Sequence, residues 1–83
     1  MSFMFEVLYK PPPDPRREAV ISERVSQLGG RLTYREEPAP IGVGAVTLTY
    51  EFDDLQVAQK AASSLRSQGE HVEGPMDYGD GKT

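Results

Sequence analysis

The stretch AVTLTYEFDDLQVAQKAASSL, residues 45–65, decides the fold because it joins a strand to a helix. In its first half apolar side chains alternate with polar ones, which is typical of a strand with one buried face. The apolar members of this alternation are Val46, Leu48, Tyr50 and Phe52. Asp53 or Asp54 can then cap a helix that ends at Gly69. The predicted apolar positions of that helix are Leu55, Ala58, Ala62 and Leu65.

A strand followed by a helix also opens the chain. FMFEVLY, residues 3–9, alternates in the same way and predicts a strand, which stops where the prolines of residues 11–13 remove the amide donors. Asp14 then stands at an N-cap position, and the helix predicted over residues 15–28 ends at two glycines. Its predicted buried stripe consists of Val20, Ile21, Val25 and Leu28.

Each predicted helix leads into a further strand. RLTYREE, residues 31–37, has the alternation of a half-exposed strand, with Leu32 and Tyr34 on one face. EHVEGPM, residues 70–76, gives a weaker fourth strand whose best core candidate is Val72. The order is therefore strand, helix, strand, strand, helix, strand.

This order resembles the ferredoxin-like βαββαβ architecture, an α+β fold. Because crossovers are right-handed, the two halves are expected to form a four-stranded antiparallel sheet with both helices on one face. We predict one domain over residues 1–76 and a flexible C-terminal tail over residues 77–83, which is rich in Gly and Asp.

The sheet face without helices is the predicted interaction surface. The residues expected on it are Met4, Glu6, Leu8, Thr33, Arg35, Thr47, Thr49 and Glu51. The connection PAPIGVG, residues 38–44, is long for a hairpin and offers Ile41 and Val43 for contact. The mixed chemistry of this face favours a non-enzymatic domain that binds a protein partner or associates with itself, in a biological process that the sequence does not name.

Composition narrows the classes of partner. The 83-residue chain carries a net charge of −4, which argues against nucleic acid and anionic membranes as partners. It has no cysteine, so disulfides, thiolate metal sites and thiol catalysis are excluded. No apolar run approaches the length of a membrane span, and we expect a cytoplasmic protein without a cofactor.

Residues 46–65 resemble the third strand and second helix of the RNA recognition motif in spacing. In that family this strand carries a basic residue and aromatic side chains that stack on bases. The matching positions here are Ala45, Thr47 and Thr49, which cannot stack. We therefore expect the topology of that family without its RNA binding.

Residues 5–36 are also similar to the first half of ACT-type ligand-sensing domains, and the segment from Val46 onward to their second half. The resemblance implies an anionic metabolite bound at the turn before the first helix. The cations near that turn are Lys10, Arg16 and Arg17, although its four prolines remove backbone donors. A small-metabolite sensor is therefore the alternative function.

The sequence shows no catalytic pattern, so we expect no enzyme activity, no catalytic residue and no metal site. The lone histidine has neither a cysteine nor a second histidine with which to complete a metal set. If two subunits built a site between them, the residues to test would be His71, Tyr9 and Tyr50.

Overall fold

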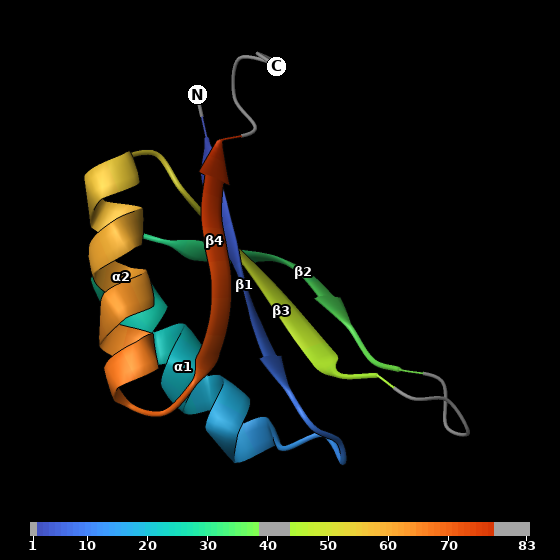
Figure 1. Ribbon diagram of the computed structural model, residues 1–83. Coiled ribbons are helices and arrows are strands. Elements are labelled where there is room, and N and C mark those ends of the chain that lie inside the picture. Colours follow the sequence, from blue (N-terminus) through green and yellow to red (C-terminus); the bar gives the residue numbers. More distant parts are fainter. Residues whose placement is uncertain (1, 39–43, 78–83) are drawn as a thin grey trace.

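The computed structural model describes residues 2–38 and 44–77, and the elements follow the predicted order (Figure 1). They are β1 (Phe3–Tyr9), α1 (Pro15–Gln27), β2 (Arg31–Glu36), β3 (Val46–Phe52), α2 (Leu55–Ser67) and β4 (His71–Asp77). The four strands form one antiparallel sheet in the order β2-β3-β1-β4. The predicted ferredoxin-like α+β fold is therefore confirmed.

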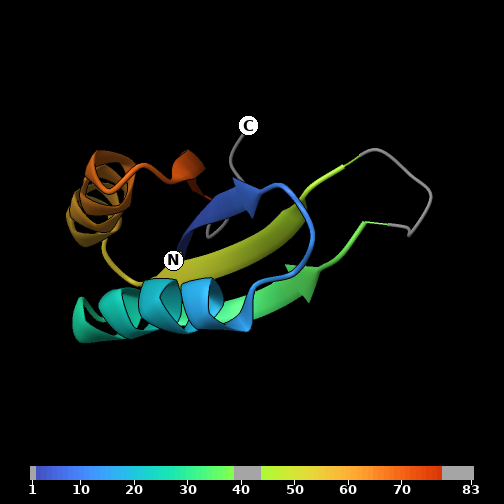
Figure 2. The same ribbon diagram turned by 90° about the horizontal axis from the view of Figure 1, so that it is seen from below.

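Both helices lie on one side of the sheet, which leaves the opposite side uncovered by any described element (Figures 1 and 2). β1 and β3 form the middle of the sheet, and their side chains alternate between buried and partly exposed along all seven residues of each strand. The buried side packs against the apolar stripes of the helices. The largest fully buried side chains of this core are aromatic: Phe5 lies 5.9 Å from Tyr50 and 5.3 Å from Phe52 between ring centroids.

The two helices begin and end in the same way. Asp14 and Asp54 accept hydrogen bonds from backbone amides of the first helical turn, as predicted for N-caps. Gly29 and Gly69 follow the helices with φ of 92° and 94°, and in each case the next amide bonds back to the last turn in a Schellman motif. The halves differ in the strand-to-helix connection, which residues 10–13 lengthen in the first half.

The predicted alternation of β2 is wrong after Leu32. Leu32 pairs with Tyr50, but a β-bulge follows and Tyr34 pairs with Thr49. The extra residue of a bulge turns every later side chain to the other side of the strand. Tyr34 therefore lies on the uncovered side of the sheet, and Arg35, which was expected there, lies on the helix side.

Two predicted core positions are also wrong. Val20 is 65% exposed, because α1 buries the stripe that contains Ile21 and Val25 and turns Val20 away from the sheet. Leu55 opens α2 at 39% exposure, and Ala61 occupies the core in addition to the predicted alanines. In β4, the predicted Val72 is buried, and Asp77, assigned to the tail, is the last residue of the strand.

Candidate interaction surface

Twelve side chains on the uncovered side of the sheet form a grid, which we name the open sheet face. The strand registers place them in three rows that run across β2, β3, β1 and β4. The first row is Arg31, Glu51, Met4 and Met76; the second is Tyr34, Thr49, Glu6 and Glu73; the third is Glu36, Thr47, Leu8 and His71.

The open sheet face combines apolar and acidic groups. Its larger apolar side chains are Met4, Leu8, Tyr34 and Met76, and the last two are 59% and 46% exposed. Glutamates occupy positions in all three rows, whereas Arg31 is the one arginine of the face and no lysine belongs to it. Arg31 itself is paired with Glu51 at 3.3 Å and with Asp53 at 3.2 Å. The face is therefore acidic with apolar side chains between the charges.

Two of these glutamates repel each other. Glu6 on β1 lies directly opposite Glu73 on β4. Like charges opposite each other on neighbouring strands destabilise a sheet. Glu73 lies 3.1 Å from His71 Nε2, whereas Glu6 has no hydrogen-bond or ion-pair partner among the described residues. The centre of the face thus carries negative charge that its own neighbours do not fully balance.

The structure brings four of the predicted interaction residues together. Met4, Leu8, Thr47 and Thr49 lie on the open sheet face, and each is partly exposed. Ile41 and Val43 lie outside the described residues. Arg35 must be removed from the predicted surface, because it pairs with Leu48 and reaches α1, and Tyr34 takes a place on the face instead.

A polar cluster holds the beginning of α1 against the sheet. Tyr9, at the end of β1, donates its hydroxyl hydrogen to Glu18 and accepts a hydrogen bond of 2.8 Å from the Asp14 amide. Arg35 reaches the same Glu18 carboxylate with contacts of 2.6 and 3.0 Å and also bonds to Glu37 at 2.6 Å. This cluster links three elements through one carboxylate.

Electrostatics within this cluster follow from its hydrogen bonds. The Arg35 guanidinium, assisted by the Tyr9 hydroxyl, holds the pKa of Glu18 below its ordinary value. Burial, together with the hydrogen bond to Glu18, raises the pKa of Tyr9. The ion pairs with Glu18 and Glu37 raise the pKa of Arg35. Glu18 is therefore a carboxylate and Tyr9 a neutral phenol at neutral pH.

The predicted anion-binding cations have different environments. Arg17 stacks over the Tyr9 ring at 4.8 Å from its centroid and forms a bidentate pair with Glu70, with a closest contact of 2.8 Å. Lys10 and Arg16 are exposed and bond to no other described residue. The guanidinium of Arg17 is thus used to tie α1 to the turn before β4.

The three residues named for an intersubunit enzyme site lie on opposite sides of the sheet. His71 belongs to the open sheet face, whereas Tyr9 and Tyr50 point to the helix side. Tyr50 is buried, its hydroxyl lies 2.8 Å from that of Ser22, and burial raises its pKa. One chain therefore does not bring them into a common site.

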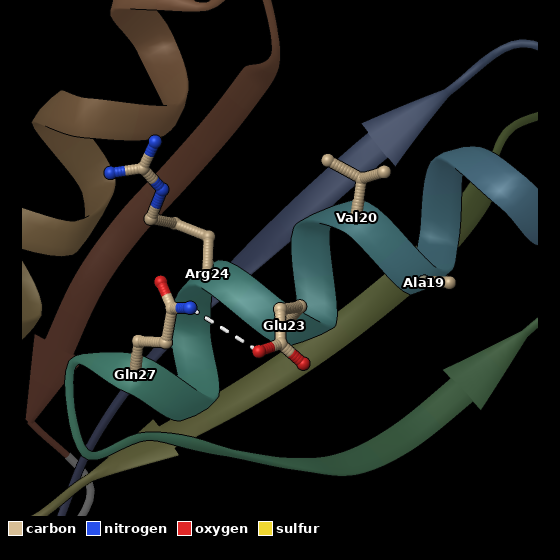
Figure 3. A pocket seen from close by; sticks show the side chains of 5 residues that line it. All are labelled: Ala19, Val20, Glu23, Arg24 and Gln27. Atoms are coloured by element: carbon tan, nitrogen blue, oxygen red, sulfur yellow. Dashed lines mark hydrogen bonds between the residues drawn. The ribbon is translucent and has the colours of Figure 1, made fainter.

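In residues 2–38 and 44–77, no group of three or more His, Cys, Asp or Glu side chains is arranged to hold a metal ion. Neither of the helices is long and apolar enough to cross a membrane. A shallow depression of about 370 Å³ lies on the outer surface of α1 and is lined by Ala19, Val20, Glu23, Arg24 and Gln27 (Figure 3).

Neither the known protein-family models nor the curated proteins include a match to this chain. By its strand order and its net charge of −4, the chain is an acidic, ferredoxin-like α+β domain with an open sheet face.

Proposed function

We propose that the chain is a non-enzymatic protein-interaction domain whose open sheet face binds a segment of another protein that carries basic and apolar side chains. The observation that supports this most strongly is the composition of the face, in which Met4, Leu8 and Tyr34 alternate with glutamates and no described element covers them. Exposed apolar side chains rimmed by charge are typical of binding surfaces.

The chemistry of the partner follows from charge complementarity. A lysine or arginine of the partner placed between Glu6 and Glu73 would relieve the repulsion of the two carboxylates. The aliphatic stem of such a side chain would lie on Leu8 or Met4 while its charged group reaches the glutamates. The same charges repel the phosphates of nucleic acid, and the rings of Tyr34 and His71 on the face do not offset this repulsion.

The residues at the beginning of α1 give less support to a metabolite-sensing function. Arg17 is already paired with Glu70, Asp14 caps the helix, and Glu18 adds a further negative charge in the first turn. A cytoplasmic location is part of the proposal, since a chain without cysteine needs no oxidising compartment.

A titration of labelled protein with a synthetic peptide pool tests the proposal. Peptides in which Lys or Arg alternates with Leu or Tyr should shift backbone amides of β1 and β3, and a matched pool with Glu in place of the basic residues should not. Binding should weaken with added salt, because exposed charges are screened.

Two variants make this experiment specific. Glu6→Lys reverses the charge at the centre of the open sheet face and should weaken the binding of the basic pool about tenfold or more. Lys60→Glu changes a charge on an exposed position of α2 and should leave binding unchanged. Equal affinities of the wild type and Glu6→Lys, or shifts confined to α1 and α2, would overturn the proposal.

A further inference from the structure

The two edges of the sheet are covered to different degrees. At β4, the Arg66 side chain of α2 donates hydrogen bonds to the carbonyl oxygens of Val72 and Gly74, both at 2.9 Å. Pro75 of the same strand has no amide hydrogen to offer a neighbour. These contacts use the groups with which an additional strand would pair.

β2 has no such cover. The residue of α1 that matches Arg66 in the helix-ending motif is Ser26, whose side chain is too short for the same role. Within residues 2–38 and 44–77, no side chain hydrogen-bonds to the backbone of β2. All six residues of the strand are exposed, with Leu32 at 45% and Tyr34 at 59%. β2 is therefore the edge at which a further strand can pair.

The sequence of β2 is complementary to itself in the antiparallel direction. Arg31 and Glu36 stand at its two ends and both belong to the open sheet face, since they pair with Glu51 and Thr47. When Arg31 is set opposite Glu36 of a second copy, the two-fold axis generates the same ion pair a second time.

In the same register, paired residues of the two copies have their side chains on the same side of the sheet. Leu32 falls opposite Arg35 of the second copy, and both side chains lie on the helix side. Thr33 of one copy falls opposite Tyr34 of the other, next to the two-fold axis. The bulges of the two strands therefore lie side by side, and each strand has the same four residues between Arg31 and Glu36. A shift by one residue would set open-face side chains against helix-side ones, which strand geometry does not allow.

We propose that β2 pairs in antiparallel fashion with β2 of a second copy of this chain, with Arg31 of each copy opposite Glu36 of the other. The two sheets then form one continuous sheet with all helices on the same side. Because the bulge limits the ladder to a few pairs, the dimer is weak and reversible, with a dissociation constant between about 10 µM and about 1 mM. This inference goes beyond the proposed function, because the open sheet face stays free.

Sedimentation equilibrium over a range of concentrations tests the pairing with two charge reversals. Arg31→Glu and Glu36→Arg each set like charges opposite each other at both ends of the ladder, and each should weaken dimerisation about tenfold or more. An equimolar mixture of the two variants restores both ion pairs and should form a heterodimer with the affinity of the wild type. Lys60→Glu, a charge reversal away from the edge, should dimerise normally.

Thermal melting of each variant separates misfolding from lost pairing. Arg31→Glu also loses the pairs with Glu51 and Asp53, whereas Glu36 bonds to no other described residue, so Glu36→Arg should fold normally. A wild type that is monomeric up to about 1 mM would overturn the inference and leave the binding of basic peptides unaffected. A dimer that tolerates both reversals, or a mixture that forms no heterodimer, would also overturn it.

Discussion

Glu6 and Glu73 lie directly opposite each other on β1 and β4, and no basic residue stands between them. The same row of the sheet contains Thr49 and Tyr34, so the negative charge is not neutralised along it. This like-charge pair lowers the stability of the sheet, and the basic side chain of the proposed partner would relieve the repulsion.

Replacing Glu6 with glutamine should stabilise the protein. The change keeps the shape of the side chain and removes one of two facing charges, so the free energy of unfolding should rise by about 0.2–1 kcal/mol. The gain should shrink at high salt, which urea unfolding at two ionic strengths can measure. Glu23→Gln on the surface of α1 is the matched control and should change stability by less than about 0.5 kcal/mol. A lower stability of Glu6→Gln would show that the carboxylate has a favourable partner.

Gly30→Ala should destabilise the core. A Cβ atom at this position would lie 2.4 Å from a ring carbon of Phe52 and 2.6 Å from Val25 Cγ1. Both neighbours are buried and cannot move freely, so we expect a loss of about 1–3 kcal/mol in urea unfolding.

Gly29→Ala is the control for Gly30→Ala. Apart from the adjacent chain, no atom of the described residues lies within 4 Å of a Cβ added at Gly29, so the stability cost of Gly29→Ala comes from the φ of 92°. Shortening a neighbour in Phe52→Leu should therefore reduce the cost of Gly30→Ala and not that of Gly29→Ala. An equal effect on both glycine variants would contradict steric crowding at Gly30.

Glu18 should make stability depend on pH under acidic conditions. Its folded pKa is depressed by Arg35 below the ordinary value of 4.5, so the folded state favours the carboxylate. The resulting stabilisation is present above that value and is lost as pH falls through the lower folded pKa. Glu18→Gln should therefore be less stable than the wild type at pH 7, and the difference should decrease toward about pH 3. Parallel stability curves for the two proteins would contradict this role.

Arg66→Met should loosen β4. The guanidinium donates to two backbone carbonyls, and the loss of these charge-assisted hydrogen bonds should lower the free energy of unfolding by about 1–3 kcal/mol. Amide exchange should become faster in β4 before it does in β3. Arg24→Met on α1 is the control, since Arg24 bonds to no other described residue, and it should have little effect.

Local signals in the sequence predicted the elements closely. Asp14 marked the beginning of the first helix and the pair Asp53 and Asp54 that of the second, where the structure selects Asp54. Gly29 and Gly69 marked the helix ends, because capping depends on residues within one turn. The alternation of β1 and β3 also identified which of their side chains are buried, and thereby half of the open sheet face.

The sequence alone did not reveal the contacts that join distant segments. Glu18, Glu70 and Arg66 bind partners on other elements, and as polar helical or turn residues they carried no local signal of this in the sequence. The prediction that Val20 is buried was wrong because Val20 borders the apolar stripe of α1. The orientation of the helix on the sheet decides whether such a residue is buried.

By itself, the sequence determined the order of the elements, their caps and the ferredoxin-like arrangement, because these depend on periodicity and on residues close together in the chain. Only the tertiary structure decided the side on which Tyr34 and Arg35 lie. A bulge arises when a strand pairs with its neighbour, and the letters RLTYRE read equally well with or without one. That single extra residue placed the ring of Tyr34 on the open sheet face and Arg35 on the helix side, where it pairs with Glu18.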